Sequence, residues 1–491
     1  MPEKERIHTN GTVAAHSALG LLLSAAADEL FPEREFYIEH SFIGGFYCHF
    51  GQNSPATRDE LNQLSQRIKI YLQDERPIEI IEVDRSLLEE RFQLRERGDK
   101  LEILGRIRQD PVPASRCRQY LDYRLEPMST DPEALQDFNL ALYDTGFVLR
   151  SPAVDADLPE YDSPKLYQII QQREEWGRAL HVNNLYQLNA RLVENHDLQL
   201  PLLAEALHEK TIAEIADSLA GDFPQRRTVF IAGPSSSGKT TFSKRLAIQV
   251  KVIMLDTLTV SMDDYFKDRD EMTPSTDGSL DFESLDAMDV ELLTADIRRL
   301  LAGETIQRRK YSFRKGRGYY NDETRQLDEN AFLAVEGIHG LNPVFPEQLG
   351  AETVQRIYVS AITQLNIDNE HRVFSSDNRL IRRLVRDAQF RGYSAEETLS
   401  RWPSVRQGEE RYIFTHQEQA DLMFNSSLIY ELCALRPKAE AILQAVPAHS
   451  PARAEADRLL MFLGFITPID EGAVPRTSIL REFLGNGAFE Y

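Results

Sequence analysis

Cysteine and positive charge are both scarce in this sequence. Cys48, Cys117 and Cys433 are the only cysteines in 491 residues, and they lie far apart. Without a C-x-x-C pair, the sequence argues against a disulfide framework and a cysteine-based zinc site. Lysine and arginine number 56 against 78 aspartate and glutamate residues, which gives a net charge of −22. Because general nucleic-acid affinity requires an excess of basic side chains, nucleic acid is not an expected partner.

Long hydrophobic runs are also lacking. The most apolar early run, residues 18–27, is followed by Asp28 and Glu29, so it is too short to cross a bilayer and predicts a core helix. The N-terminus reads Met-Pro-Glu-Lys-Glu-Arg and shows no apolar region of a secretory signal. We therefore expect a cytoplasmic protein without a membrane partner. With 42% apolar and 27% charged residues, the composition is that of a globular protein, and 491 residues allow two or three domains.

A phosphate-binding loop is predicted between residues 229 and 241. The stretch VFIAGPSSSGKTT fits the pattern G-x-x-x-x-G-K-[ST], with an apolar strand expected over 228–232 and a helix over 242–250. In such loops backbone N–H groups wrap phosphate oxygens, the lysine reaches the β- and γ-phosphates, and the threonine hydroxyl binds Mg²⁺. The sequence thus predicts ATP and Mg²⁺ as cofactors, bound by Gly233, Ser235, Ser236, Ser237, Gly238, Lys239, Thr240 and Thr241.

Two adjacent carboxylates follow the next predicted strand. The segment 259–269, TVSMDDYFKDR, is a short apolar strand that ends in Asp263 and Asp264. At the C-terminal end of a parallel strand, a carboxylate can face the nucleotide cleft and accept the proton of an attacking hydroxyl or hold Mg²⁺ through water. We take Asp263 as the general base and a metal-site residue, and Asp264 as the alternative. An acidic loop that caps a helix is the competing interpretation.

Three further segments follow in a fixed order. They are SLDFESLDAMD at 279–289, RKYSF at 309–313 and the apolar strand AFLAVEGIH at 331–339. Together with the phosphate loop, this order resembles the uridine kinase and phosphoribulokinase family.

The resemblance implies roles for single residues. Glu283 falls on the carboxylate that meets ribose hydroxyls, and Glu336 falls on the acidic strand end near Mg²⁺. The family's histidine after the Tyr-x-Phe segment is missing, and Gly316 stands about where it would be. That leaves the nucleobase, and even the acceptor class, open. The substrate contacts expected in this region are Asp264, Tyr265, Glu283, Tyr311 and Phe313.

An arginine-rich segment lies at 377–392, DNRLIRRLVRDAQFRG. Its arginines, Arg391 included, are mostly three or four residues apart, so most share one face of a helix. The family has the same Arg-Leu-x-Arg-Arg-x-x-Arg-Asp pattern in its lid, where guanidinium groups offset developing charge and exclude water. The resemblance implies that Arg383 and Arg386 act in catalysis and that Arg379 and Arg382 bind substrate. A solvated charged helix is the alternative.

The first 155 residues are similar to a different family. A helix at 12–30, strands at 35–39 and 46–50 around a Gly44-Gly45 turn, and an acidic helix from about 57 to 73 resemble the second N-terminal domain of threonyl-tRNA synthetases, a proofreading hydrolase. Its chemistry is not retained, because Gly20 replaces the second histidine of the first helix. Arg124 and Met128 stand where the later Cys and His would be. We therefore expect His16, His40 and His49 to be surface or structural histidines.

We divide the chain into residues 1–155, a helical connector at 156–224 and a kinase domain at 225–491. The connector begins with an Asp- and Pro-rich linker at 152–164 and continues with helices at 165–180 and 200–219. After the arginines, residues 420–427 resemble the family's last core strand, and residues 477–485 predict a C-terminal helix without assigned chemistry.

The predicted fold class is therefore α/β: a P-loop kinase domain with a parallel sheet and helices on both faces, preceded by an α+β module. The whole chain resembles bacterial nucleoside kinases fused to a synthetase-like domain. The expected reaction is ATP-dependent phosphotransfer to the 5′-hydroxyl of a pyrimidine nucleoside such as uridine or cytidine. A kinase for a sugar phosphate or another nucleoside and a nucleotide-gated RNA-binding protein are the alternatives. The choice between ATP and GTP and the formation of a homo-oligomer stay open.

Overall fold

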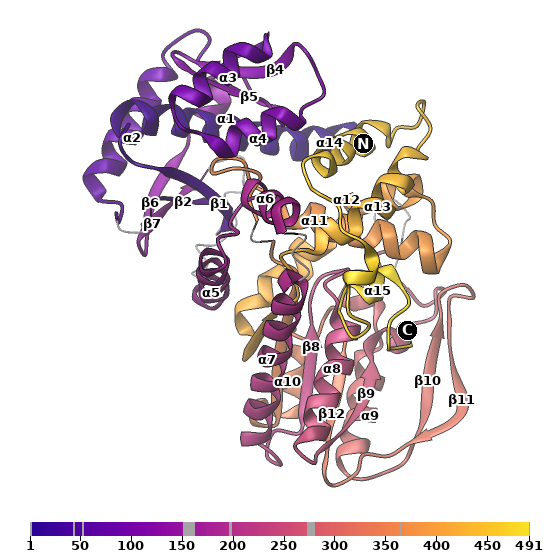
Figure 1. Cartoon of the computed structure of the whole chain (residues 1–491). Helices are drawn as coiled ribbons and strands as arrows, with labels where there is room; N and C mark the ends of the chain where they lie inside the picture. Colours follow the sequence, from indigo (N-terminus) through magenta and orange to yellow (C-terminus); the bar gives the residue numbers. More distant parts are fainter. Residues whose placement is uncertain are drawn as a thin grey trace. The chain divides into compact units, whose positions relative to one another are not determined.

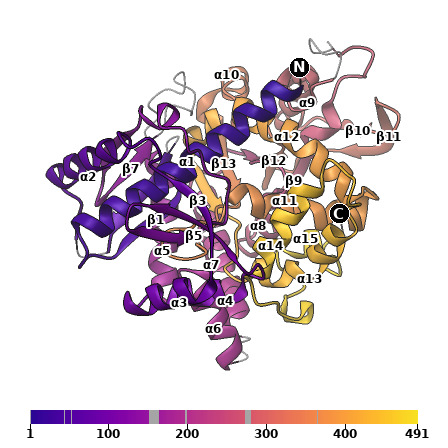
Figure 2. The same cartoon turned by 90° about the horizontal axis from the view of Figure 1, so that it is seen from above.

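The computed structural model describes residues 2–42, 45–51, 54–150, 163–195, 199–272, 280–363 and 365–490. The chain folds into two compact units, each assembled from several segments (Figures 1 and 2). The predicted linker at 152–164 lies almost entirely outside the described residues. Unit 1 comprises Met1–Asp197, Thr363–Phe374 and Met461–Thr467, and unit 2 comprises Leu198–Ile362, Ser375–Leu460 and Pro468–Tyr491.

Unit 1 is an α+β structure with two antiparallel sheets in its described part. One sheet has the strand order β1-β2-β7-β6 and the other has the order β3-β4-β5. The strands are β1 (Phe36–Phe42), β2 (Gly45–Phe50), β3 (Glu79–Val83), β4 (Val112–Cys117), β5 (Tyr120–Tyr123), β6 (Asn139–Tyr143) and β7 (Gly146–Arg150). The helices are α1 (Pro2–Leu30), α2 (Arg58–Tyr71), α3 (Arg85–Leu94), α4 (Gly98–Arg106), α5 (Pro164–Ala179) and α6 (Leu185–Asn195).

The core of unit 1 forms where α1 and α2 pack on the first sheet. The apolar run predicted to be a core helix is part of α1, and Leu19 and Leu22 are fully buried in one cluster with Phe147. Helix α2 begins at a capping box, in which the Thr57 hydroxyl accepts from the N–H of Glu60 at 3.3 Å and the Glu60 carboxylate accepts from the N–H of Thr57 at 2.8 Å. Among the helices in the described ranges, none is both long and apolar enough to cross a membrane.

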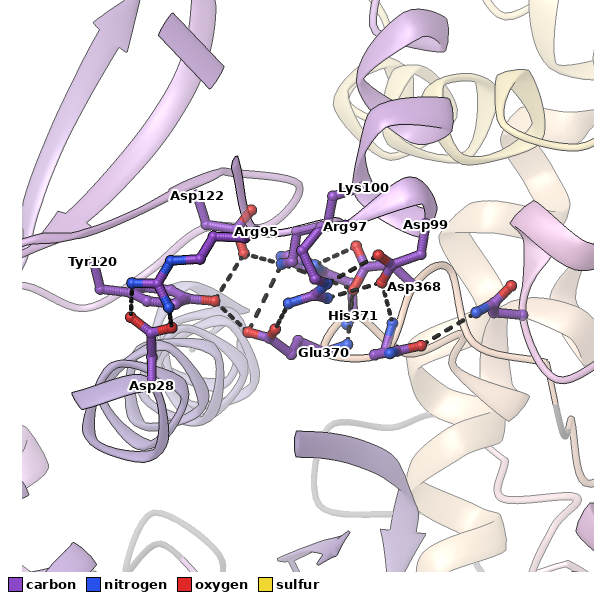
Figure 3. A network of polar contacts seen from close by, with 12 residues as sticks. Asp28, Arg95, Arg97, Asp99, Lys100, Tyr120, Asp122, Asp368, Glu370 and His371 are labelled. Atoms are coloured by element: carbon purple, nitrogen blue, oxygen red, sulfur yellow. Dashed lines mark hydrogen bonds and ion pairs between the residues drawn. The ribbon is translucent and has the colours of Figure 1, made fainter. Parts of the chain in front are cut away.

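A buried charge network joins the segment Thr363–Phe374 to the rest of unit 1 (Figure 3). The ammonium group of Lys100 is almost fully buried and lies near the carboxylates of Asp122, Asp368 and Glu370. Burial of an unpaired charge is costly, so the cation and the carboxylates depend on one another. The network therefore fixes in unit 1 a segment that is followed directly in the chain by the arginine-rich helix.

Unit 2 is built on a five-stranded parallel sheet with the order β14-β13-β8-β12-β9. A separate two-stranded hairpin, β10-β11, accompanies it (Figure 1). The strands are β8 (Thr228–Ala232), β9 (Asp256–Ser261), β10 (Ile306–Ser312), β11 (Arg317–Arg325), β12 (Ala331–Glu336), β13 (Val354–Ser360) and β14 (Leu422–Asn425). The helices are α7 (Gln199–Gly221), α8 (Lys239–Val252), α9 (Val290–Leu301), α10 (Val344–Leu349), α11 (Ser375–Arg386), α12 (Ala395–Tyr412), α13 (Glu431–Gln444), α14 (Arg453–Gly464) and α15 (Arg481–Leu484); α14 continues into the last segment of unit 1.

Helices cover both faces of the parallel sheet, as predicted. Phe230 and Leu333 of the sheet share a core cluster with residues of α9 and α10. Phe424 of β14 instead packs on Phe242 of α8, with ring centroids 4.7 Å apart. The strand expected over 228–232 is confirmed as β8.

The C-terminal helix predicted over 477–485 is wrong in extent. Only Arg481–Leu484 forms a helix, α15, and the residues before it form turns. The guanidinium group of Arg481 donates to the carbonyl oxygens of Glu471 and Val474, which holds this stretch in its turns. Helices α11, α13 and α15 lie close together within unit 2 (Figure 2).

Candidate functional site

The phosphate loop connects the buried strand β8 to helix α8. Gly233 has no room for a side chain, because a β-carbon there would collide with the carbonyl oxygen of Val359. Gly238 adopts a left-handed φ of +83° at the start of α8, and a β-carbon on it would lie 2.6 Å from Ile479. The two glycines of the motif are therefore required by close packing and backbone conformation at the two ends of the loop.

Lys239 and Thr240 begin helix α8, next to the carboxylate of Glu336. The Lys239 ammonium donates to the carbonyl oxygens of Gly233 at 2.7 Å and Pro234 at 3.0 Å. The Thr240 hydroxyl donates to the carboxylate of Glu336, at the end of β12, at 2.7 Å. Burial lowers the pKa of Lys239 and raises that of Glu336, while the charge of each opposes the shift of the other.

The Thr240–Glu336 pair fits a Mg²⁺ site. Mg²⁺ prefers oxygen ligands and is commonly bound through one or two carboxylates together with substrate phosphates. No group of three or more His, Cys, Asp or Glu side chains in the described ranges could hold a metal ion by itself. A hydroxyl and a carboxylate beside the phosphate loop are thus the type of partial ligand set that a nucleotide would complete.

The two carboxylates after β9 lie in different environments. Both belong to the 3₁₀ turn Met262–Tyr265, but Asp264 forms an ion pair with Lys310 at 2.8 Å. Burial raises the pKa of Asp263, and the positive charge of Lys239 opposes this shift. Tyr265 is buried in the core and its hydroxyl donates to Asp296 at 3.1 Å. Of the three residues, Asp263 is therefore the one whose charge is coupled to the phosphate-loop lysine.

Glu283 is coupled by charge to residues beside the phosphate loop. Burial and the neighbouring charge of Glu409 raise the pKa of Glu283 to about 7, and the charges of Asp263 and Lys239 act on it as well. It packs against α12, because a β-carbon at Gly408 would collide with the Glu283 side chain. The structure thus brings Lys239, Asp263 and Glu283 into one electrostatically coupled group.

Aromatic side chains gather next to this group. The rings of Tyr311 and Phe313 are 5.1 Å apart, and Phe266 contacts both at 5.6 and 5.5 Å. Tyr311 is buried and Phe313 is half exposed, so Phe313 presents a face for stacking. Gly316, where the family's histidine is missing, has a left-handed φ of +66° and no room for a β-carbon, because the Arg269 side chain packs against it.

The four predicted lid arginines divide into two kinds. Arg379 and Arg382 are buried and form ion pairs with Glu409 and Glu431, respectively. They also donate to the phosphate loop itself, Arg379 to the carbonyl oxygen of Ser235 at 3.1 Å and Arg382 to that of Ser236 at 3.3 Å. Their charge is therefore compensated by the protein, and their contacts shape the loop.

Arg383 and Arg386 are less completely compensated. Each contacts Asp387 at 3.3 Å, and Arg391 shares this carboxylate at 3.6 Å. Arg383 also donates to the hydroxyl of Ser235 at 3.0 Å. Three cations share one carboxylate at the edge of the phosphate loop, which leaves an electropositive position there.

Three residues of the site are not found by sequence reasoning. Glu409 accepts from the N–H of Ser235 at 2.9 Å, Arg269 packs at Gly316, and Glu482 contacts Thr241. Glu409 and Glu482 lie 174 and 241 residues from their partners, and no local pattern marks them.

Comparisons of the sequence with known proteins find kinases among its relatives. Residues 228–428 match the family model described as "Phosphoribulokinase / Uridine kinase family". A uridine kinase from Chlamydia pneumoniae is 29% identical over 40% of this chain and 80% of that protein, and one from Chloroflexus aurantiacus (strain J-10-fl) is 26% identical over 44% and 96%. A solved structure described as a possible uridine kinase from Bacillus stearothermophilus is 16% identical, with a TM-score of 0.30, and covers 44% of this chain and 98% of that chain.

The phosphate loop, the parallel sheet that carries it and the family match coincide in one stretch of the chain. Residues 228–428 form a P-loop kinase domain of the phosphoribulokinase and uridine kinase family.

Proposed function

We propose that this protein transfers the γ-phosphoryl group of ATP to the 5′-hydroxyl of a pyrimidine nucleoside such as uridine or cytidine. The observation that carries the proposal is the coupling of Lys239, Asp263 and Glu283 beside the phosphate loop, next to a cluster of aromatic rings. In the proposed reaction these three residues would serve as phosphate ligand, proton acceptor and partner for sugar hydroxyls, respectively.

In the proposed reaction Asp263 accepts the proton of the attacking 5′-hydroxyl. The hydroxyl oxygen bonds to the γ-phosphorus, the bond from this phosphorus to the bridging oxygen breaks, and ADP leaves. Burial raises the pKa of Asp263, which makes its ionised form a stronger base than an exposed aspartate. Lys239, Arg383 and Arg386 would offset the charge on the transferred group.

The metal is assigned by the chemistry of the residues beside the loop. Thr240 and Glu336 would hold Mg²⁺ together with the nucleotide, and Asp263, whose charge acts on Glu336, would contribute. When bound, Mg²⁺ supplies positive charge that neutralises the phosphate oxygens.

On the acceptor side, Glu283 would accept hydrogen bonds from ribose hydroxyls, and the half-exposed ring of Phe313 would stack on a base. Arg269 supports a second candidate, because its guanidinium group donates to the carbonyl oxygen of Phe313 and brings a cation to the aromatic cluster. A cation there would favour an acceptor that already carries a phosphate, such as a sugar phosphate.

Release of ADP from Mg²⁺-ATP, measured against a panel of nucleosides and sugar phosphates, tests the proposal. Uridine- or cytidine-dependent release that is absent in Lys239→Ala is the expected result. Asp263→Asn should lower the rate about 10²- to 10⁴-fold, as expected for loss of a general base. Asp264→Asn is the matched control and should lose far less, because that carboxylate is paired with Lys310. ADP release stimulated only by sugar phosphates would favour the second candidate. If no acceptor of the panel stimulates ADP release, both candidates are refuted.

For residues 1–155 we propose a threonyl-tRNA synthetase-like α+β fold that has lost its proofreading chemistry. Burial lowers the pKa of His16, on the first helix, to about 4. The three cysteines are buried, in keeping with the proposed cytoplasmic location.

A further inference from the structure

A carboxylate from the C-terminal segment contacts the helix that follows the phosphate loop. The Glu482 carboxylate accepts from the hydroxyl of Thr241 at 2.8 Å and from the N–H of Thr241 at 3.2 Å. Glu482 belongs to α15, which begins 53 residues beyond the stretch matched by the family model. This contact is therefore an addition to the kinase domain rather than a part of its matched core.

The position of this carboxylate has the properties of an anion site. Thr241 is in the first turn of α8, where backbone N–H groups and the helix dipole favour negative charge. The negative charge of Glu482 also acts on Lys239 and Arg386, two cations of the proposed phosphate site. The two donors of Thr241 that would serve a phosphate group thus bind a carboxylate of the protein, and the charge of that carboxylate acts on two cations of the same proposed site.

The rest of the segment holds Glu482 against the loop. Ile479 packs so closely on Gly238 that a β-carbon there would lie 2.6 Å from it. The carbonyl oxygen of Leu484 accepts from Gln389 and from Lys438, each at 2.8 Å. Gln389 lies in the π-helical turn that follows α11, so the same turn carries lid residues and anchors the C-terminal segment.

We propose that Glu482 is an internal competitor for the nucleotide: its carboxylate occupies the place of a phosphate group at Thr241 and must leave when a nucleoside diphosphate or triphosphate binds. The inference rests on the proposed function, since it takes the loop to be a nucleotide site. Its consequence is that Glu482 sets the nucleotide affinity of the enzyme, because displacement of the carboxylate lowers the net affinity.

The alternative role for Glu482 is that of a positioning residue that orients Thr241 for the nucleotide. The two roles predict opposite effects of neutralising the carboxylate. A competitor, once neutralised, no longer repels the phosphate groups, so affinity rises. A positioning residue, once neutralised, holds Thr241 less firmly, so affinity falls.

Calorimetric titration of the full chain with ADP at constant Mg²⁺ tests the inference. Glu482→Gln keeps the shape and removes the charge, and we expect ADP to bind at least about tenfold more tightly, a factor equivalent to one strong charge-assisted contact. Glu482→Asp withdraws the carboxylate by one methylene and should give a smaller gain, which also provides a result if the glutamine variant does not fold. Glu490→Gln, an exposed glutamate of the same segment, is the matched control and should bind ADP like the wild type.

The outcomes separate the inference from the proposed function. In one outcome the wild type binds ADP, Lys239→Ala abolishes this binding, and both Glu482 variants bind ADP as tightly as the wild type or more weakly. This outcome overturns the competitor role but leaves the nucleotide site intact. Absence of ADP binding in the wild type and in both Glu482 variants overturns the competitor role together with the proposed function.

Discussion

The carboxyl group of Glu283 should make the unfolding free energy of unit 2 depend on pH, and Glu283→Gln should remove this contribution. Burial raises its pKa most, the charge of Glu409 raises it further, and the opposing charge of Arg383 only partly compensates. The result is a pKa of about 7 in place of 4.5. The folded protein therefore holds this proton more tightly than the unfolded chain does, so the stability contributed by Glu283 is lost as the pH rises from about 4.5 through about 7.

The size of the effect follows from the two pKa values. One pKa unit corresponds to about 1.4 kcal/mol, so the full difference amounts to about 3 kcal/mol. Most of it, about 2.5 kcal/mol, falls between about pH 5 and about pH 8.5, where the folded and unfolded forms differ in proton binding. Glu283→Gln has the same shape and no titrating proton, so the difference in unfolding free energy between wild type and variant should shift by this amount, in favour of the variant at high pH.

Urea unfolding followed by tryptophan fluorescence can measure this difference. The chain has two tryptophans. In a Trp176→Phe background the remaining one, Trp402 of α12, lies 5.4 Å from Arg379 and reports on unit 2. Glu291→Gln, an exposed glutamate of α9, is the matched control and should follow the wild-type curve. The unfolding free energies of wild type and Glu283→Gln are compared at each pH. If their difference stays constant with pH, or shifts in favour of the wild type as the pH rises, the assigned burial and charge environment of Glu283 is refuted.

Two further substitutions test the buried ion pairs. Arg382→Met should lower the unfolding free energy by about 3–5 kcal/mol, because it leaves the Glu431 carboxylate buried without its cation. The double variant with Glu431→Leu should recover most of this loss. Equal urea midpoints for the single and double variants would contradict the prediction. Lys100→Met should destabilise unit 1 for the same reason, and the loss should shrink as the pH falls and the stranded carboxylates become protonated. Fluorescence of Trp176, in unit 1, measures the second effect, and a loss independent of pH would count against it.

Several elements of the kinase fold could be predicted from local sequence patterns. The strand at 228–232, the glycines at 233 and 238 and the helix after them depend on neighbouring residues and could be predicted from them. The extent of the C-terminal helix could not, because the side chain of Arg481 takes up carbonyl oxygens of Glu471 and Val474 and stabilises turns instead. Periodicity contains no information on such contacts between side chain and backbone.

The partners of the arginines were beyond prediction for a related reason. The spacing of Arg379 and Arg382 places both on one helix, but it cannot indicate that carboxylates 30 and 49 residues further along the chain will neutralise them. Likewise the contact between Glu482 and Thr241 joins residues 241 apart. Sequence motifs identify groups that can bind phosphate, whereas only the folded chain shows which of these groups the protein already uses.

This distinction assigns different tasks to the arginines of α11. A buried guanidinium that is paired with a carboxylate adds little net charge to the site, so Arg379 and Arg382 are suited to hold the carbonyl oxygens of Ser235 and Ser236 in place. Arg383 and Arg386 share a single carboxylate with a third arginine, and under the proposed function their excess positive charge would offset charge on the transferred phosphoryl group. One helix thus holds the phosphate loop with two of its arginines, and under the proposed function it would offer net charge to the transferred group with the other two. A loop held in this way is preorganised. Substitution of Arg383 or Arg386 would therefore change the charge near the proposed substrate while the loop conformation is retained.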